Sequence, residues 1–209
     1  MNTFVEIPAD NYALSRRTPV CDVAINDADY KVQPKINGKK VMCPIYQKWV
    51  DMISRCYSDR FQTRRPSYSG CTVVEEWLLF SNFRRWMLTK DWQDKHLDKD
   101  ILIPNNKMYS PEACMFVTLE INNLMLDNHT NRNDHPLGVH YDKTRNKFKA
   151  ELSVRGKNQF IGRYSTPEEA HLAYRRCKST HIRAVALKQE EPLRSALMKH
   201  ADSLYVSFL

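Results

Sequence analysis

The chain has 209 residues, and 32 Lys and Arg against 24 Asp and Glu give it a formal net charge of +8 and a pI of about 9.2. This length suits one large or two small domains with proper cores, and the basic charge indicates acidic partners. No run of 18 or more apolar residues occurs, so no membrane-spanning helix is expected. The N-terminus lacks a basic start followed by an apolar core, so we expect no signal peptide and a cytoplasmic location.

Residues 1–40 are rich in Pro, Asn, Asp and Lys, and they show little periodicity. Short strands fit residues 20–25 and 30–32, and Asn37-Gly38 predicts a turn. We interpret the segment as an irregular N-terminal arm that is docked on the next domain or partly loose. Its basic residues make it a candidate for DNA contact, with a solvated loop as the favoured alternative. These residues are Arg16, Arg17, Lys35, Lys39 and Lys40.

Residues 41–128 are predicted to form a mostly helical domain. Apolar residues recur at helical spacing from Cys43 to Tyr57 and again from Glu75 to Thr89, with a short strand from Cys71 to Val74 between them. The residues predicted to point inward are Ile45, Trp49, Met52, Ile53 and Cys56 in the first helix and Trp77, Phe80, Phe83 (or Arg84) and Met87 in the second. Large aromatic side chains at this spacing usually pack in a core.

The last third of this domain reads as a ββα unit. A strand that includes Asp98 is followed by a polar turn, a second strand from Pro111 to Val117 and a helix from Thr118 to Asn128. His96 and Asp100 each lie two residues from Asp98, so the three side chains face one side if the segment is a strand. The polar residues 129–135 are predicted to be a linker.

Residues 136–186 predict three short strands and a helix. From Lys147 to Arg155 apolar and polar residues alternate, which places them on opposite faces of a strand. Arg155 to Asn158 gives a turn, and a third strand follows from Gln159 to Tyr164. Thr166 is predicted to cap the helix, whose apolar stripe covers one face of the sheet. That stripe consists of Ala170, Ala173, Tyr174 and Cys177.

Most of the net charge lies in this segment, where eleven Lys or Arg stand against four Asp or Glu. Such a concentration favours a polyanionic partner for the open face of the sheet. The alternative is that a small sheet carries Lys for solubility and edge protection. Residues 187–209 predict a C-terminal helix that starts near Pro192. The expected fold class is therefore α+β, with a mostly helical N-terminal domain, a three-stranded antiparallel sheet packed on one helix, and a C-terminal helix.

Four blocks in this segment resemble, in order, the plant ethylene-response-factor (apetala-type) DNA-binding domain. They are Leu137-Gly138-Val139, Lys147 to Leu152, Phe160 to Tyr164, and Thr166 to Ala170 with Tyr174. The resemblance covers about forty residues and implies a sheet that enters the major groove of double-stranded DNA, with outward side chains that read bases. The chain has His140 where the family has Arg and Phe160 where it has Trp, so the resemblance does not fix the base sequence.

The resemblance gives two groups of candidate DNA-binding residues. Candidates for base contacts are His140, Lys147, Glu151, Ser153, Asn158 and Phe160. Candidates for phosphate contacts, which position without specifying sequence, are Arg145, Lys149, Arg155 and Lys157, and Arg163 belongs to the same surface.

The stretch from Trp49 to Asn123 resembles phage and bacterial HNH-type homing endonucleases. The matching residues are Trp49, Met52, Arg55, Cys56 and Tyr57; Trp77, Phe80 and Phe83; Leu97 to Asp100; Tyr109, Pro111, Cys114, Phe116 and Val117; and Ile121-Asn122. The resemblance implies a nuclease that uses Mg²⁺ or Mn²⁺ to stabilise the scissile phosphate and a general base to activate water. A phage-encoded protein of this kind acts in the cytoplasm of its host.

In that family the first strand of the unit usually ends in Asp-His, and the His is the base. Here Asp98-Lys99 stands at that place, and a protonated Lys is no base without a strongly lowered pKa. The candidates are therefore His96 as a substitute base, Asp98 and Asp100 as ligands of a divalent ion, and Lys99 as a stabiliser of the transition state. Asn122, with Asn123 and Asn128 as alternatives, is the candidate for a ligand on the helix. The alternative for His96 is an ordinary polar residue near a turn.

Four Cys lie in or beside the nuclease-like stretch, and they are Cys43, Cys56, Cys71 and Cys114. Thiolate ligands suit a structural zinc ion. No closely spaced Cys pair is present, and buried free Cys behaves as a small hydrophobe, so plain thiols are the alternative. For the whole chain, a sequence-targeted DNA endonuclease and a DNA-binding regulator that has lost catalysis remain the two main hypotheses, ahead of a structural protein of a phage-like particle.

Overall fold

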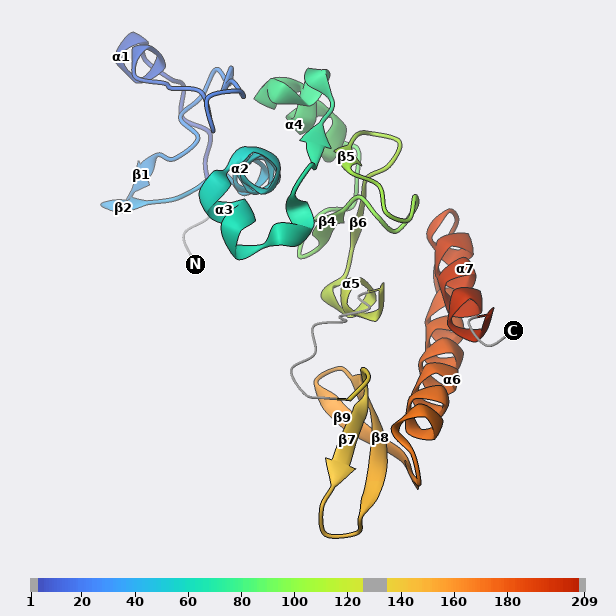
Figure 1. The fold of residues 1–209 in the computed structure, drawn as a ribbon. Helices are drawn as coiled ribbons and strands as arrows, with labels where there is room; N and C mark the ends of the chain where they lie inside the picture. Colours follow the sequence, from blue (N-terminus) through green and yellow to red (C-terminus); the bar gives the residue numbers. More distant parts are fainter. Residues whose placement is uncertain (1–3, 126–134, 207–209) are drawn as a thin grey trace. The chain divides into compact units, whose positions relative to one another are not determined.

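The computed structural model describes residues 4–125 and 135–206, and the fold is α+β as the sequence predicts. Contacts divide the chain into two compact units, residues 1–116 and 117–209. Figure 1 shows the elements of both units. Among the described residues, no helix has the length and apolar character needed to cross a membrane.

Short helices and very short strands make up the first unit. Its helices are α1 (Asn11–Ser15), α2 (Pro44–Tyr57), α3 (Asp59–Arg64), η1 (Pro66–Tyr68), η2 (Glu75–Leu78) and α4 (Phe80–Leu88). The strands up to residue 117 are β1 (Lys35–Ile36), β2 (Lys39–Lys40), β3 (Thr72–Val73), β4 (His96–Asp98), β5 (Met108–Tyr109) and β6 (Met115–Val117). They pair as β1 with β2, β3 with β5, and β4 with β6.

Helix α2 is the centre of the first core, and all five residues that the sequence predicts to face inward are buried. The indole Nε1 of Trp49 donates a hydrogen bond to the carbonyl of Trp77 at 2.7 Å, which fixes α2 against η2. The predicted helix from Glu75 to Thr89 is in fact two, η2 and α4, with Leu79 extended between them. The cause is non-local, because Ile25 of the N-terminal arm forms a parallel bridge with Leu79.

The N-terminal arm is docked on this core. Ala24, Ala28 and Tyr30 are buried in it. The guanidinium of Arg17 donates to three backbone carbonyls of the arm, at 3.0 Å to Asn26, 2.6 Å to Ala28 and 2.9 Å to Tyr30. Arg17 therefore stabilises the fold of the arm and is not a free cation for DNA.

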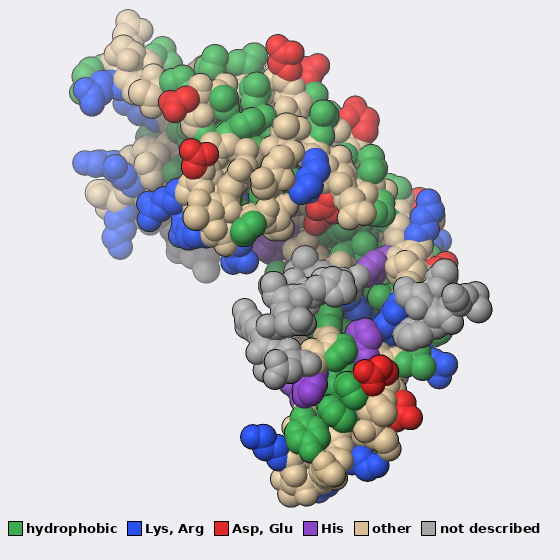
Figure 2. All heavy atoms as spheres, viewed as in Figure 1, with side chains coloured by type: hydrophobic (Ala, Val, Ile, Leu, Met, Phe, Trp, Pro, Cys, Tyr) green, Lys and Arg blue, Asp and Glu red, His purple; other side chains and the backbone are tan. Residues whose placement is uncertain are grey.

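A two-stranded hairpin projects from the same arm. Asn37 and Gly38 form its turn with positive φ values of 50° and 76°, as the sequence predicts, and two positive values in succession suit a tight hairpin. Lys35 lies opposite Lys40, and both side chains are exposed, as is Lys39. Figure 2 shows Lys and Arg side chains gathered over this hairpin.

The second unit contains the only sheet of three strands among the described residues. Its elements are α5 (Leu119–Met125), β7 (Val139–Asp142), β8 (Lys147–Val154), β9 (Lys157–Tyr164), α6 (Pro167–Ala186) and α7 (Leu193–Val206). The sheet is antiparallel in the order β7-β8-β9. The predicted linker 129–135 and the last turn of the predicted helix 118–128 lie largely outside the described residues.

The sheet packs on α6 through the face that the alternation in β8 predicts. Ala150 and Leu152 are buried against Ala170 and Tyr174 of the helix. Thr166 and Glu169 form a full capping box, in which each side chain accepts from the other residue's backbone N–H. Figure 1 shows α7 lying along α6. Their contact buries the apolar residues Ile182, Ala186, Leu197, Ala201 and Leu204.

Candidate nucleic-acid interface

The strand register decides which side chains lie on the face of the sheet opposite α6. Residues that pair directly in an antiparallel sheet point to the same side, and successive residues alternate. Lys149 pairs with His140 on one side and with Arg163 on the other, so these three side chains form a row across the sheet. Because the neighbouring Ala150 is buried against α6, the row lies on the opposite face of the sheet. This face, which α6 does not cover, is called the open face.

The same rule places eight of the eleven predicted DNA-binding residues on the open face. They are His140, Lys147, Lys149, Glu151, Ser153, Asn158, Phe160 and Arg163. Arg145 and Arg155 lie in the two turns that connect the strands. Lys157 pairs with Val154, whose side chain packs on the α6 side, so Lys157 points away from the open face.

Internal ion pairs reduce the free positive charge of this face. The ammonium of Lys149 is 2.9 Å from the carboxylate of Glu151. Asp142 accepts from Nε of Arg163 at 3.0 Å and lies 3.6 Å from Arg145. The hydrogen bond from Arg163 holds the pKa of Asp142 below its usual value, so this carboxylate stays ionised. Pairs of this kind fix side-chain orientation more than they add stability.

The turn residue Arg155 is also paired. Its Nε donates to both carboxylate oxygens of Glu120 on α5, at 3.1 and 3.2 Å, while 75% of the side chain stays exposed. Of the eleven basic residues counted in 136–186, four lie on α6 rather than on the sheet, namely Arg175, Arg176, Lys178 and Arg183. The open face is therefore polar with ordered charges, and it is less basic than the sequence count alone suggests.

Three of the predicted catalytic residues lie on and just after β4. Leu97 is buried and His96 is exposed, so the alternation puts His96 and Asp98 on the same side of the strand. Asp98 is half-buried, and its Oδ1 accepts from the backbone N–H groups of Asp100 and Ile101 at 2.7 and 2.9 Å. Burial raises the pKa of Asp98 above its usual value, against the opposing effect of these two hydrogen bonds. Asp98 thus organises the turn after the strand.

Lys99 is held as a buried structural cation. Only 5% of the residue is exposed. Its Nζ donates to Oδ1 and Oδ2 of Asp100 at 2.7 and 2.8 Å and to the carbonyl of Asn106 at 2.5 Å. Asn106 returns a hydrogen bond to the carbonyl of Lys99 at 3.0 Å. These contacts join the turn after β4 to the segment before β5, so Lys99 has a structural role that the sequence does not reveal.

These contacts bear on the predicted divalent ion. Both carboxylate oxygens of Asp100 face the ammonium of Lys99, and a cation bound to Asp100 would meet that charge at close range. The donor set at Asp98 and Asp100 therefore does not fit Mg²⁺ or Mn²⁺ in this arrangement. Asn122, the predicted helix ligand, lies on α5 in the second unit, whereas Asp98 belongs to the first.

All four cysteines named as zinc candidates are buried in the first unit. The Sγ of Cys43 lies 3.5 Å from the hydroxyl of Tyr30. Burial raises the pKa of Cys56 and of Cys114 to about 12, so both are protonated at neutral pH. In the part of the chain that the structure describes, no three His, Cys, Asp or Glu side chains are grouped to hold a metal ion. The zinc site stays a prediction.

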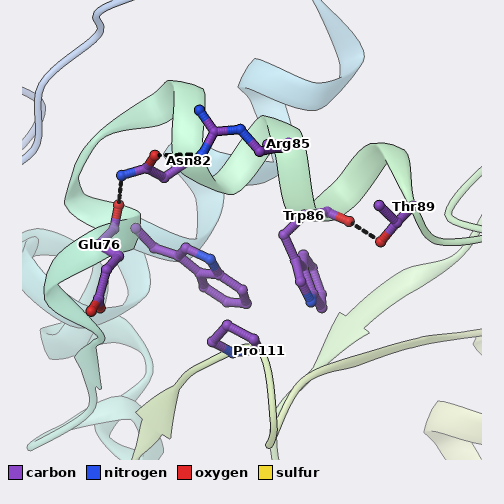
Figure 3. A pocket seen from close by; sticks show the side chains of 7 residues that line it. Glu76, Asn82, Arg85, Trp86, Thr89 and Pro111 are labelled. Carbon is purple, nitrogen blue, oxygen red and sulfur yellow. Dashed lines mark hydrogen bonds between the residues drawn. The ribbon is translucent and has the colours of Figure 1, made fainter.

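A cavity of about 400 Å³ opens beside η2 and α4. Figure 3 shows the side chains that line it, with Asn82 beside Arg85 on α4 and with Trp86 and Pro111 apart from that pair. Asn82 is held from both ends, because its Nδ2 donates to the carbonyl of Glu76 at 2.9 Å and its Oδ1 accepts from Arg85 at 3.2 Å. None of the four predicted catalytic residues lines this cavity.

Sequence reasoning missed Asp142 as part of the interface. The sequence shows it only as one of four acids in a basic segment. Its role comes from the pairing of β7 with β8 and of β8 with β9, which brings it to Arg163 across the sheet. The chain matches no protein-family model, no curated protein and no solved structure. The two family resemblances therefore stay predictions from the motifs.

Proposed function

We propose that the protein binds double-stranded DNA through the open face of the β7-β8-β9 sheet. The observation that carries the proposal is the common placement of eight predicted DNA-binding side chains on the one face that α6 does not cover. The major groove of DNA is wide enough to admit strands of a sheet, and its base edges offer distinct patterns of donors and acceptors.

The chemistry of the face supports recognition of bases as well as attraction to phosphates. Ser153 lies opposite Asn158 near one end, and both can donate and accept hydrogen bonds. Glu151, which lies opposite the exposed Phe160, supplies an acceptor of the kind that pairs with the amino group of cytosine. Arg145 and Arg155 in the turns are placed at the ends of the strands, where phosphate contacts set orientation.

A titration of the purified protein with labelled double-stranded DNA tests the proposal, with single-stranded DNA and inorganic polyphosphate as competitors. We expect binding that weakens with salt, and weaker competition from polyphosphate than from duplex DNA at equal charge. The double variant Ser153→Ala, Asn158→Ala should lose the preference for duplex DNA, while Lys199→Ala on α7 should not. Equal competition by polyphosphate, unchanged in the double variant, would contradict the proposal.

Cleavage of the bound DNA remains the prediction of the nuclease resemblance. The element order supports it, because β4 pairs with β6 and α5 comes next, as in a ββα unit. The Lys99–Asp100 ion pair argues against a divalent ion at these carboxylates. The observations therefore favour a DNA-binding protein in which the β4 segment has a structural role.

Incubation of plasmid DNA with the protein and Mg²⁺ or Mn²⁺ separates the two hypotheses. Binding without nicking, unchanged in the variants Asp98→Ala and His96→Ala, is the outcome we expect. Nicking that requires the metal and disappears in both variants, while DNA binding is retained, would establish the endonuclease instead.

A further inference from the structure

A change of register in the sheet brings Phe160 and Arg163 to the same face. Residues three apart on a regular strand point to opposite sides. Here Ala150 pairs with Gly162 but the next residue, Glu151, pairs with Phe160, so Ile161 is an extra residue on β9. Such a bulge re-aims the side chains on either side of it. Arg163 and Phe160 consequently lie together on the open face.

The two side chains are in contact. The guanidinium carbon of Arg163 is 4.8 Å from the centroid of the Phe160 ring, within the range of a cation–π interaction. Phe160 is 53% exposed, although a large apolar side chain left in water forgoes the free energy that its burial would contribute. An exposed aromatic ring that supports an arginine is typical of a contact surface.

Asp142 holds the same guanidinium from the side. Its carboxylate accepts from Nε of Arg163 at 3.0 Å, and its own side chain is only 15% exposed. Within the described residues, the hydrogen bond of the Arg163 guanidinium is donated by Nε, and none is donated by the terminal nitrogens Nη1 and Nη2. The guanidinium is thus fixed by the ring and by Nε, and its outer edge is free to donate two parallel hydrogen bonds.

We infer that Arg163 determines sequence specificity by donating both terminal amino groups to O6 and N7 of one guanine in the major groove, with Asp142 and Phe160 as positioning residues. The inference rests on the proposed function, because it requires the sheet to bind duplex DNA. A bidentate contact of this type discriminates between bases through geometry.

A phosphate contact is the competing role for Arg163. An arginine that serves only to attract phosphates gains from full charge and free rotation, and here a nearby carboxylate offsets the charge and restricts the rotation. Restriction of this kind favours a directional contact, because the orientation is set before binding. Arg145 provides an internal comparison, since it approaches the same carboxylate at 3.6 Å but lies in the turn between β7 and β8.

Selection of bound sequences from a pool of randomised duplex DNA tests the inference. The full chain is compared with Arg163→Lys, which keeps the charge and loses the two-pronged donor, and with Arg145→Lys as the matched control. We expect one guanine in the selected sequence to lose its preference by about tenfold in Arg163→Lys, with the other positions unchanged. The sequence selected by Arg145→Lys should equal that of the wild type.

A second variant, Phe160→Leu, keeps Arg163 and removes its aromatic support, and it should weaken the preference for the same guanine only. The inference is overturned if Arg163→Lys selects the wild-type sequence and merely binds all DNA less tightly, which is the signature of a phosphate contact. It is also overturned if the wild type binds duplex DNA without selecting any sequence. Failure of the wild type to bind duplex DNA at all would instead refute the proposed function.

Discussion

Gly138 lies just before β7, where the backbone approaches the ring of Tyr174 on α6. Its φ is +78°, and a Cβ at this position would stand 2.1 Å from Cδ2 of that ring. No other residue combines tolerance of this φ with the absence of a side chain. Gly138 therefore sets how closely the sheet can approach the helix.

Replacement of Gly138 by Ala should lower the free energy of unfolding of the second unit by about 3 kcal/mol, because backbone strain adds to a steric clash. Chemical denaturation followed by circular dichroism measures the loss. Gly156→Ala is the matched control, since Gly156 has a φ of +75° but nothing within 4 Å of the added Cβ. The control should lose only about 1 kcal/mol, the strain alone. Equal losses would show that the contact with Tyr174 is unimportant.

The raised pKa of Asp98 predicts how the stability of the first unit depends on pH. Burial raises the pKa of Asp98 in the folded state above the usual value of 3.8. At a pH between 3.8 and the raised pKa, the folded protein therefore binds more protons than the unfolded chain. The stability of the first unit falls as the pH rises through this window, and the loss is complete above the raised pKa. Asp98→Asn avoids the charge and keeps an oxygen for the N–H groups of Asp100 and Ile101.

We therefore expect Asp98→Asn to unfold at a higher denaturant concentration than the wild type at pH 7, with the difference closing as the pH falls through the raised pKa. The control is Asp91→Asn, because Asp91 is exposed and pairs with Lys95 on the surface. A destabilised Asp98→Asn variant at pH 7 would mean that attraction to Lys99 outweighs the cost of burial.

Among single residues, the sequence predicts the inward-facing positions well and the ion pairs poorly. Alternation along one strand is enough to assign Lys149 to the open face. The pairing of Asp142 with Arg163 depends on the register of three strands and on the bulge at Ile161, and none of these is encoded in a local pattern. The burial of Lys99 escapes prediction for the same reason, since its partner Asn106 comes from the loop before β5.

At the scale of elements, helix α6 begins at a capping box that the sequence partly predicts. Thr166 as the cap and Glu169 in the first turn are readable from their spacing, and the structure contains both reciprocal hydrogen bonds. The box satisfies backbone N–H groups that have no partner within the helix. It fixes where α6 starts and hence which of its residues meet the sheet.

Thr166→Ala should lower the free energy of unfolding of the second unit by about 1 kcal/mol, because the cap loses its acceptor for the N–H of Glu169. Thermal unfolding followed by circular dichroism provides the measurement. Thr180→Ala within α6 is the control, since the Thr180 hydroxyl donates to the carbonyl of Arg176 in the same helix and is exposed. A loss in Thr166→Ala no greater than in Thr180→Ala would argue against a contribution from the box.

The elements that the sequence predicts correctly are those with one strong local period. Helix α2 matches its prediction because its five buried apolar residues recur at helical spacing, and a strand would place them on both of its faces. The predicted helix from Glu75 to Thr89 is broken at Leu79, since Ile25 pairs with it from far away in the chain. Strand β9 begins at Lys157, two residues earlier than predicted, because the turn uses only Arg155 and Gly156.

At the scale of the whole molecule, the distribution of charge leads to a prediction about salt. Lys149 lies at the centre of the open face, between His140 and Arg163. Lys149→Ala should weaken binding to all duplex sequences alike and lower the slope of log affinity against log salt by about one, if Lys149 neutralises one phosphate. Binding titrations at several salt concentrations measure the slope, and Lys199→Ala on α7 is the control. A change in sequence preference with an unchanged slope would assign Lys149 to a base instead.

The whole-molecule organisation is only partly readable from the sequence. The α+β class and the three-stranded sheet with its helix can be derived from periodicity and turn residues. The boundary between the two compact units falls at residue 117, inside β6, and no change of composition marks that point. Such a division depends on which segments pack together, and packing is a property of distant residues.

The reactivity of the buried cysteines can report the transient opening of the first unit. The thiolate is the form that reacts with labelling reagents, and burial keeps Cys56 and Cys114 both protonated and covered. Each becomes reactive when the first unit opens, whereas Cys177 on α6 of the second unit is partly exposed and serves as an internal standard for the labelling reagent. The rate of labelling at Cys56 and Cys114, read by mass spectrometry on the wild-type chain, therefore reports the opening of the first unit. Addition of DNA to such an experiment would tell whether the ligand stabilises the first unit against opening.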